Sequence, residues 1–359
     1  MSVSLIMAGG FGKRLWPESK LSHPKQFLTI KNEESLIGST YQRCINFFGV
    51  ENTFIITRQD LKEKMISHIP GLLPEQIISE PISKDTAACI GFATILIKRK
   101  KNDIPVVILP SDHLIANEKE FNKVMKVAVK SAEKGYLATI GIKPTRAETG
   151  YGYLQVGNKI EQFNEIPCYK LKRFTEKPSQ KKAKEFLENG NFLWNAGIFA
   201  WRPSVILEEI KKYLPSLDKE LEKIRKILGT DQEEKIIKKI YSRFPKISID
   251  YAIMEKTTKA IVIPAEFIWD DIGEWRALER ILSKNKEGNI IQGLIKEIGT
   301  NNCIFINKEN KILGAIGISD IIVINSKEGL LIVKKELSPK VKDLVEELLE
   351  DKKLRKYVE

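Results

Sequence analysis

Cysteine and histidine are scarce in this chain of 359 residues. The four cysteines are Cys44, Cys89, Cys168 and Cys303. They are far apart in the sequence, and neither they nor the three histidines have the spacing of a metal site. We therefore expect no disulfide framework and no zinc site. Free, packed thiols are typical of a protein in the reducing cytoplasm.

Long hydrophobic runs are also missing. No apolar stretch approaches the roughly 18–20 residues that cross a bilayer. The first apolar run, Val3–Ala8, has no basic segment ahead of it, which favours a buried strand over a signal peptide. We expect no membrane association.

Acidic residues are fewer than basic ones. The chain has 59 Lys and Arg residues and 47 Asp and Glu residues, which gives a net charge of +12. A basic protein suits anionic ligands such as nucleotides, sugar phosphates or nucleic acid, and the charge alone does not choose among them. We find no clustered basic face and no nucleic-acid-reading motif, so no nucleic-acid partner is expected.

The pattern of residues 1–150 alternates between short apolar runs and amphipathic stretches. The expected strands are Val3–Ala8, Thr53–Thr57, Val106–Leu109 and Ala138–Ile142, with Tyr151–Val156, Lys170–Phe174 and Ala260–Pro264 further on. The expected helices are Ser35–Phe48, Thr86–Arg99 and Glu118–Lys134. Nearly all-apolar strands between helices are typical of a doubly wound, mostly parallel α/β (Rossmann-like) sheet.

From about Asn285 the chain consists of short Ile/Val runs broken by Gly and Asn, which predicts a small β domain. The spacing of apolar residues in Val341–Lys353 predicts a terminal helix with one packed face. We therefore predict two domains, residues 1–284 and 285–359.

A glycine-rich turn follows the first strand. Gly9, Gly10 and Gly12 allow backbone N–H groups to approach phosphate oxygens, and Lys13 and Arg14 add positive charge. An arginine can also grip a phosphate with two hydrogen bonds. The alternative is a plain strand-to-helix turn.

Two familiar phosphate motifs do not fit this turn. A G-x-G-x-x-G fingerprint would need glycine at Leu15, and a P-loop would need glycine at Met7. A further cation, Lys25, follows Pro24 and is a candidate second phosphate ligand, although a lone lysine is more often a surface residue.

Carboxylates occur in two suggestive places. Ser111 and Asp112 follow the strand Val106–Leu109, at the edge where such sheets bind ligands. Asp112 could hold Mg²⁺ or simply cap a turn. Asp270 and Asp271 lie between aromatic residues, and the pattern does not decide which of them faces a site or whether both begin a helix.

Taken together, these motifs resemble the sugar-1-phosphate nucleotidyltransferases, and within them the branch that transfers GMP to mannose 1-phosphate. The matching stretches are Gly9–Pro17, Pro24–Leu28, Glu80–Pro81 with Asp85–Ala87, Pro110–His113, Glu148–Tyr153, Phe174–Pro178, Trp194–Phe199, Ser248–Ala252 and Trp269–Trp275. The C-terminal part resembles, more loosely, the left-handed β-helix domain of short family members.

The resemblance implies a role for particular residues. The nucleotide would be bound by Gly9, Gly10, Gly12, Lys13, Arg14, Lys25, Glu80, Pro81, Thr86, Ala87, Ser111 and Asp112. The sugar phosphate would be bound by Gly152, Glu176, Lys177 and Asn195. Mg²⁺ would be held by Asp112 and Asp271, which selects Asp271 over its neighbour. Arg14, Lys25, Asp112 and Asp271 would be the catalytic residues.

The implied reaction converts GTP and α-D-mannose 1-phosphate to GDP-mannose and pyrophosphate, by Mg²⁺-dependent in-line attack on the α-phosphorus. We expect a homodimer, and no phosphomannose-isomerase activity because the chain stops before that domain. The alternatives are another NTP or sugar 1-phosphate, such as heptose 1-phosphate, and a catalytically silent regulatory homologue.

Three positions depart from the pattern of the family. Lys13 replaces a small hydroxyl residue, which makes the turn more basic. Glu18 replaces leucine. Lys84–Asp85 replaces the frequent Arg-Asn pair and bears on the choice of base.

Overall fold

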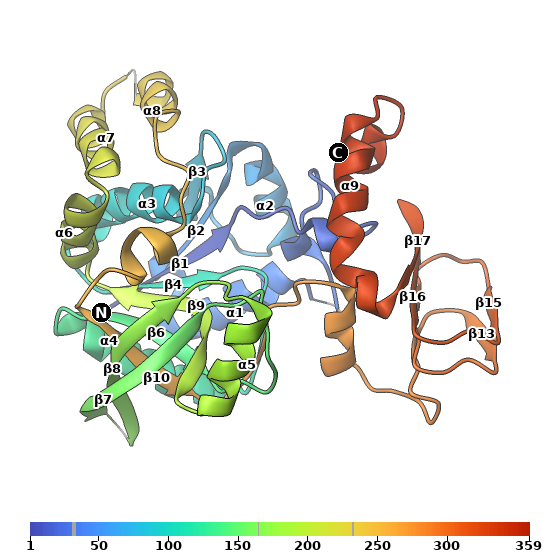
Figure 1. Ribbon diagram of the computed structural model, residues 1–359. Coiled ribbons are helices and arrows are strands. Elements are labelled where there is room, and N and C mark those ends of the chain that lie inside the picture. Colours follow the sequence, from blue (N-terminus) through green and yellow to red (C-terminus); the bar gives the residue numbers. More distant parts are fainter. Residues whose placement is uncertain (31–33, 164, 232) are drawn as a thin grey trace. The chain divides into compact units, whose positions relative to one another are not determined.

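Contacts divide the chain into two compact units, which are described separately from a computed structural model covering residues 1–30, 34–163, 165–231 and 233–359 (Figure 1). The larger unit comprises Met1–Gly9, Tyr41–Ser111 and Ile115–Trp269. The smaller unit comprises Gly10–Thr40, Asp112–Leu114 and Asp270–Glu359. Each unit therefore combines segments that are distant in the sequence.

The larger unit is built on a nine-stranded sheet. In sheet order its strands are β3 (Ile77–Glu80), β2 (Thr53–Arg58), β1 (Val3–Ala8), β4 (Val106–Pro110), β9 (Phe192–Trp201), β6 (Leu137–Ile142), β10 (Ala260–Ala265), β8 (Ile166–Thr175) and β7 (Tyr153–Phe163). Strands β1 to β4, and β6 with β10, pair in parallel, whereas β8 and β9 run antiparallel to their neighbours. The predicted doubly wound sheet is confirmed, and its antiparallel members were not predicted.

Helices cover both faces of this sheet. They are α1 (Leu36–Phe48), α2 (Lys62–His68), α3 (Thr86–Lys101), α4 (Glu118–Glu133), α5 (Gln180–Asn189), α6 (Pro203–Tyr213), α7 (Pro215–Ile227) and α8 (Glu233–Tyr241). Helices α3, α6 and α7 lie together against one face (Figure 1). Val3 and Leu5 of β1 join that core, whereas the fully buried Ile6 faces the other side, as the pleat requires.

The helix boundaries have local causes. Asp85 caps α3, since its Oδ1 accepts a hydrogen bond of 2.7 Å from the N–H of Thr86. Proline begins α6 and α7, where its missing N–H is not needed. A short π-helix, Asp250–Met254, stands where the family-like stretch Ser248–Ala252 was noted. Such turns often mark functional sites.

The smaller unit contains a β-helix-like arrangement in which the chain alternates between two sheets. One sheet holds β12 (Ile290–Gln292), β14 (Ile304–Asn307), β16 (Ile321–Ser326) and β17 (Gly329–Lys334), and the other holds β13 (Ile295–Ile298) and β15 (Leu313–Ile316). All these strands pair in parallel except β17, which pairs antiparallel to β16. Phe305, Ala315 and Val323 form the core between the two sheets.

The outer face of the four-stranded sheet packs on the rest of the smaller unit. Ile304 and Ile322 contribute to a core with Trp16, Trp275 and helix α9 (Val341–Glu350). The terminal helix is thus confirmed, although it ends before Lys353.

The segment after the glycine-rich turn is joined to the end of the chain by hydrogen bonds. The indole N–H of Trp16 donates to the carbonyl oxygen of Tyr357 at 3.1 Å. The backbone N–H groups of Leu21 and Ser22 donate to the carbonyl oxygens of Val358 and Glu359 at 2.9 and 2.8 Å.

The remaining strands, β5 (Leu114–Ala116) and β11 (Ile268–Asp270), form a two-stranded sheet. All four cysteines are buried and free, as predicted. Within the described parts of the chain, no helix has both the length and the apolar character needed to cross a bilayer.

Candidate functional site

The smaller unit brings three predicted residues together around one ammonium group. Lys25 is 7% exposed, and its Nζ lies 3.0 Å from Oδ2 of Asp112. The same Nζ donates a hydrogen bond to the backbone carbonyl oxygen of Asp271. We call Lys25, Asp112 and Asp271 the cation cluster. The charge of Lys25 is therefore flanked by the carboxylate of Asp112 and by the backbone carbonyl oxygen of Asp271, two residues that are far apart in sequence.

The glycine-rich turn fits closely against this cluster. Gly12 has a φ of 76°, and a Cβ at this position would lie 2.4 Å from Cβ of Lys25. Both the left-handed backbone and the close approach require glycine. The carbonyl oxygen of Gly12 accepts a hydrogen bond of 2.7 Å from Oγ of Ser19, which fixes the turn.

The electrostatics of the cation cluster favour an ionised carboxylate. Burial acts to raise the pKa of Asp112, but Lys25 and His113 outweigh it and hold that pKa below its ordinary value. Burial lowers the pKa of His113, against the influence of Asp112. The closest positive charge to the Asp112 carboxylate is that of Lys25, whose Nζ lies 3.0 Å away.

The other two cations of the turn do not join the cation cluster. Lys13 forms an ion pair of 3.2 Å with Glu346 of helix α9. Arg14 is exposed and has no ion-pair partner among the residues that the structure describes. Gly10 is also exposed, and a Cβ there would meet nothing within 4 Å.

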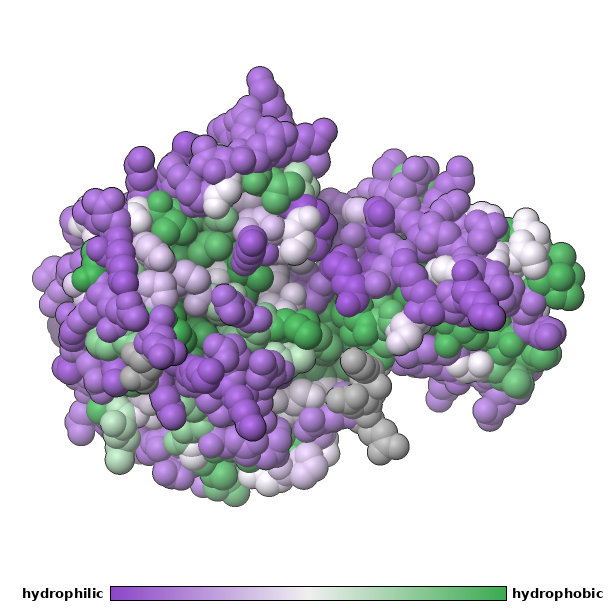
Figure 2. Space-filling model, turned by 90° about the horizontal axis from the view of Figure 1, so that it is seen from below, coloured by the Kyte–Doolittle hydropathy of each residue, from purple (hydrophilic) through white to green (hydrophobic). Residues whose placement is uncertain are grey.

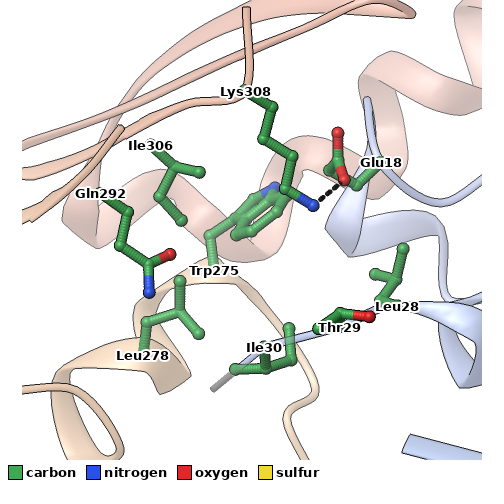
Figure 3. Close-up of a pocket in the computed structure, with 9 residues that line it drawn as sticks. All are labelled: Glu18, Leu28, Thr29, Ile30, Trp275, Leu278, Gln292, Ile306 and Lys308. Carbon is green, nitrogen blue, oxygen red and sulfur yellow. Dashed lines mark hydrogen bonds and ion pairs between the residues drawn. The ribbon is translucent and has the colours of Figure 1, made fainter. Parts of the chain in front are cut away.

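A small, shallow hollow lies elsewhere in the smaller unit (Figure 3). Its lining is largely apolar and includes Trp275, Leu278 and Ile306, with an ion pair between Glu18 and Lys308 at its rim. This pairing accounts for Glu18, where the family has leucine. None of the predicted site residues line the hollow.

In the larger unit, Glu80 is the centre of a second group of predicted residues. Glu80 ends strand β3 and is buried, and its Oε1 accepts a hydrogen bond from the hydroxyl of Tyr241. A Cβ on Gly9 would lie 3.5 Å from Oε2 of Glu80. Burial raises the pKa of Glu80, while the bond from Tyr241 lowers it, and the net shift is upward. Tyr241 was missed by the sequence analysis because only the fold places α8 beside β3.

The first turn of α3 carries further predicted residues. Oγ1 of Thr86 accepts a hydrogen bond of 2.8 Å from the N–H of Ile249. Ala87 is fully buried, and its N–H donates to the carbonyl oxygen of Ile247 at 3.2 Å. Pro81 follows Glu80 and is half-buried. Ser111 is buried, with its N–H bonded to the carbonyl oxygen of Met7 at 3.0 Å.

A third group in the larger unit centres on the carboxamide of Asn195 in β9. Its Nδ2 donates to Oδ1 of Asp250 at 3.1 Å, and its Oδ1 accepts from Oγ1 of Thr139 at 3.1 Å. Nearby, Nζ of Lys177 lies 3.0 Å from Oε1 of Glu176. We call Thr139, Glu176, Lys177, Asn195 and Asp250 the carboxamide cluster.

Gly152 lies beside two members of the carboxamide cluster, Asn195 and Glu176. The N–H of Asn195 donates to the carbonyl oxygen of Gly152 at 2.8 Å. A Cβ on Gly152 would lie 2.5 Å from Oε2 of Glu176, so glycine is needed for that carboxylate to occupy its place. The structure therefore unites all four residues predicted to hold the sugar phosphate. It adds Thr139 and Asp250, to which the sequence analysis gave no role.

Asp250 has an unusual environment. Burial and the carboxylate of Glu176 raise its pKa to about 7. Lys177 lies nearby, but its pKa is itself raised mainly by Glu176, against the effect of burial. The stretch Ser248–Ala252 could have drawn attention to Asp250, since it stood among the family-like motifs.

Comparisons with known proteins show which family the chain belongs to. A family model described as nucleotidyl transferase matches residues 3–288, and one described as MannoseP isomerase/GMP-like beta-helix domain matches residues 296–348. A mannose-1-phosphate guanylyltransferase of Klebsiella pneumoniae is 33% identical, and the alignment covers 98% of this chain and 75% of that protein.

Two solved structures are similar to this chain. The crystal structure of mannose-1-phosphate geranyltransferase from Thermus thermophilus has a TM-score of 0.85 and 30% identity, and covers 97% of this chain and 99% of its own. The structure of mannose-6-phosphate isomerase from Helicobacter pylori has a TM-score of 0.61 and 25% identity, and covers 75% of this chain and 99% of its own.

Proposed function

Since the chain belongs to the nucleotidyl transferase family, we propose that it transfers GMP from GTP to α-D-mannose 1-phosphate, releasing pyrophosphate and GDP-mannose. The observation that carries the proposal is the cation cluster, in which Lys25 is held between Asp112 and Asp271 beside a glycine-rich turn. The names of the relatives support GTP and mannose 1-phosphate as the substrates.

The smaller unit would handle the phosphates. We propose that the backbone N–H groups at Gly10 and Gly12 contact phosphate oxygens and that Lys25 and Arg14 stabilise the negative charge of the transition state and of the leaving pyrophosphate. The exposed guanidinium of Arg14 supports this, because it is available to a ligand. Lys13 would reach a phosphate only by leaving Glu346.

A divalent cation fits the chemistry of the same residues. No cluster of three or more metal-binding side chains occurs in residues 1–30, 34–163, 165–231 and 233–359. Mg²⁺, however, is usually held by one or two carboxylates together with substrate phosphates. Asp112, whose carboxylate already lies beside one positive charge, and Asp271 would supply these two carboxylates. Bound there, Mg²⁺ would neutralise charge on the phosphates.

The reaction needs alignment more than proton transfer. The phosphate of the sugar is already anionic at neutral pH, so its oxygen attacks the α-phosphorus of GTP in line with the departing pyrophosphate and no general base is required. The protein has to offset the repulsion between two polyanions and hold them in line.

The larger unit would select the base and the sugar. We propose that Glu80 accepts hydrogen bonds from the N–H groups of guanine, with Gly9, Pro81, Thr86, Ala87 and Ser111 completing the nucleotide site. Glu176, Lys177 and Asn195 would bind the sugar phosphate, and Gly152 would leave room for the carboxylate of Glu176. The hydrogen-bonded geometry of the carboxamide cluster supports this role.

We also propose a domain boundary between residues 284 and 285 and a cytoplasmic location. The two family models, which end at 288 and begin at 296, support the boundary. The four free, buried thiols support a reducing compartment.

A homodimer is our further proposal. Strands β13 and β15 turn an apolar face outward: Ile298 and its register partner Ile316 are 60% and 75% exposed. Leu294 and Ile312 extend this face, and Figure 2 shows hydrophobic side chains gathered at this end of the smaller unit. Light scattering at several concentrations tests the dimer, with Ile316→Asp expected to weaken it. A monomer at every concentration would contradict it.

The decisive experiment is an assay of pyrophosphate release. GTP with mannose 1-phosphate is compared with other NTPs and with other sugar 1-phosphates, including heptose 1-phosphate, each with and without EDTA. We expect the highest kcat/KM for GTP with mannose 1-phosphate and loss of activity in EDTA. Activity with none of the pairs would favour the silent regulatory homologue. A strong preference for another pair would replace the substrates named above.

A further inference from the structure

The orientation of the Asn195 carboxamide is fixed by its neighbours. Oδ1 of Asn195 lies 3.0 Å from the N–H of Gly197, and a backbone N–H can only donate, so the atom facing it is the oxygen. The same oxygen accepts from Oγ1 of Thr139 at 3.1 Å. Its two lone pairs are therefore both used within the protein.

Toward a ligand, Asn195 can therefore act only as a hydrogen-bond donor. One N–H of its amide is bonded to Asp250, and one N–H remains to donate. Asn195 has no acceptor left. A sugar hydroxyl that accepts a hydrogen bond from the free N–H of Asn195 still has its own O–H as a donor. Burying that O–H without a hydrogen-bond acceptor is unfavourable. Another group in the site has to supply that acceptor, and carboxylates are the strongest acceptors among side chains.

Two carboxylates lie in the carboxamide cluster, and they differ in what already binds them. Glu176 is in an ion pair with Lys177. Asp250 is partly buried at the start of the π-helix, bonded to Asn195, and has no ion-pair partner among the residues described. The charged groups that act on it are Glu176, Lys177 and, more weakly, Asp85. Asp250 is thus a half-buried carboxylate with acceptor capacity to spare, beside the free N–H of Asn195.

We propose that Asp250 binds the sugar: its carboxylate accepts the proton of the hydroxyl to which Asn195 donates, and it also holds the Asn195 amide in position. The hydroxyl is then recognised in both directions, as an acceptor by Asn195 and as a donor by Asp250. Recognition of this kind rejects sugars that lack the hydroxyl, because the buried polar groups would be left unpaired.

The test compares substrates and variants together, and it rests on the proposed function. Mannose 1-phosphate and its 2-, 3-, 4- and 6-deoxy analogues are assayed with wild type and with Asp250→Asn, whose amide oxygen can still accept from Asn195. For one hydroxyl we expect the deoxy analogue to reduce kcat/KM of the wild type about 10- to 100-fold. The same analogue should reduce that of Asp250→Asn less than about threefold. KM for GTP should be unchanged.

The control is Asp218→Asn in the first turn of α7, which should retain the full deoxy penalty. Asp250→Ser replaces Asp250→Asn if the latter does not unfold cooperatively. Equal penalties in wild type and variant at every hydroxyl, or an unchanged KM for mannose 1-phosphate in Asp250→Asn, would overturn the proposal. Inactivity of the wild type with mannose 1-phosphate would instead contradict the proposed function, and the comparison would then use the sugar 1-phosphate that the assay selects.

Discussion

Two aspartates in this protein, Asp112 and Asp250, have pKa values that are shifted in opposite directions. Burial acts to raise both. In the cation cluster, Lys25 lies 3.0 Å from Asp112 and brings its pKa down. In the carboxamide cluster, the carboxylate of Glu176 adds to the effect of burial, and the pKa of Asp250 rises to about 7. The cation cluster therefore favours an ionised carboxylate, whereas the surroundings of Asp250 in the carboxamide cluster disfavour one.

The largest expected effect tests the cation cluster. Asp271→Asn should lower kcat for pyrophosphate release at least ~100-fold in saturating Mg²⁺, because a charged ligand of the phosphate site is lost. The matched control is the adjacent Asp270→Asn. Oδ1 of Asp270 accepts from Ile272 at 2.8 Å and from Arg280 at 2.9 Å, so this change should lower the free energy of unfolding by about 1–3 kcal/mol and leave kcat nearly intact. Near-normal turnover by Asp271→Asn would remove that residue from the mechanism.

The next prediction tests the raised pKa of Asp250 by measuring how the free energy of unfolding depends on pH. Its pKa in the folded protein is about 7, against an ordinary value of 3.8, so the unfolded chain ionises more easily. The stabilising contribution present below pH ~4 is therefore lost as the pH rises through 7. Between pH 5 and 8, urea unfolding should show Asp250→Asn gaining about 1–3 kcal/mol relative to wild type. If the difference in unfolding free energy between wild type and Asp250→Asn did not change with pH, the pKa of Asp250 would not be raised, and the contrast with Asp112 would be wrong.

A smaller effect concerns the space that Glu176 occupies. Gly152→Ala places a methyl group 2.5 Å from the carboxylate oxygen and should raise KM for mannose 1-phosphate about tenfold, with KM for GTP little changed. Gly150→Ala is the control, because its Cβ would meet Glu148 at an ordinary 3.4 Å. If both variants behaved alike, the position of the Glu176 carboxylate would not matter for sugar binding.

The smallest effect concerns the hydroxyl that holds Glu80. Tyr241→Phe removes one hydrogen bond and keeps the ring stacked on Phe244, so KM for GTP should rise about fivefold with kcat unchanged. Tyr136→Phe, elsewhere in the larger unit, serves as the control. A KM for GTP equal to that of wild type would mean that Glu80 keeps its position without Tyr241.

The sequence was a good guide where the signal is local. Strand Val3–Ala8 has the predicted bounds, and helix α3 begins at Thr86 as expected because Asp85 caps it. Strand β9 was missed: its run Phe192–Trp201 contains Asn195 and Gly197, and its pairing with β4 and β6 joins residues that are distant in sequence. Such pairings have no local signature.

The same distinction between local signals and contacts made only by the fold applies to the candidate site. The glycine-rich turn and Lys25 could be selected from spacing and residue type, and the structure adds that they touch. Tyr241 and Thr139 could not be selected, since neither lies in a motif and each contributes one hydroxyl to a partner brought close by the fold. Asp250 lay in a stretch that resembles the family, but its proposed role depends on the orientation of the Asn195 carboxamide, which is fixed only in the folded structure.

The hydrogen bonds from Trp16, Leu21 and Ser22 to residues 357–359 have a practical consequence for handling the protein. A protease that clips the last few residues would sever the attachments of a loop that begins more than 300 positions earlier in the chain, and with it the support of the glycine-rich turn. We therefore expect changes at residues 357–359 to disturb the segment around Trp16, whereas changes at Met1, which is 88% exposed, should disturb the fold little.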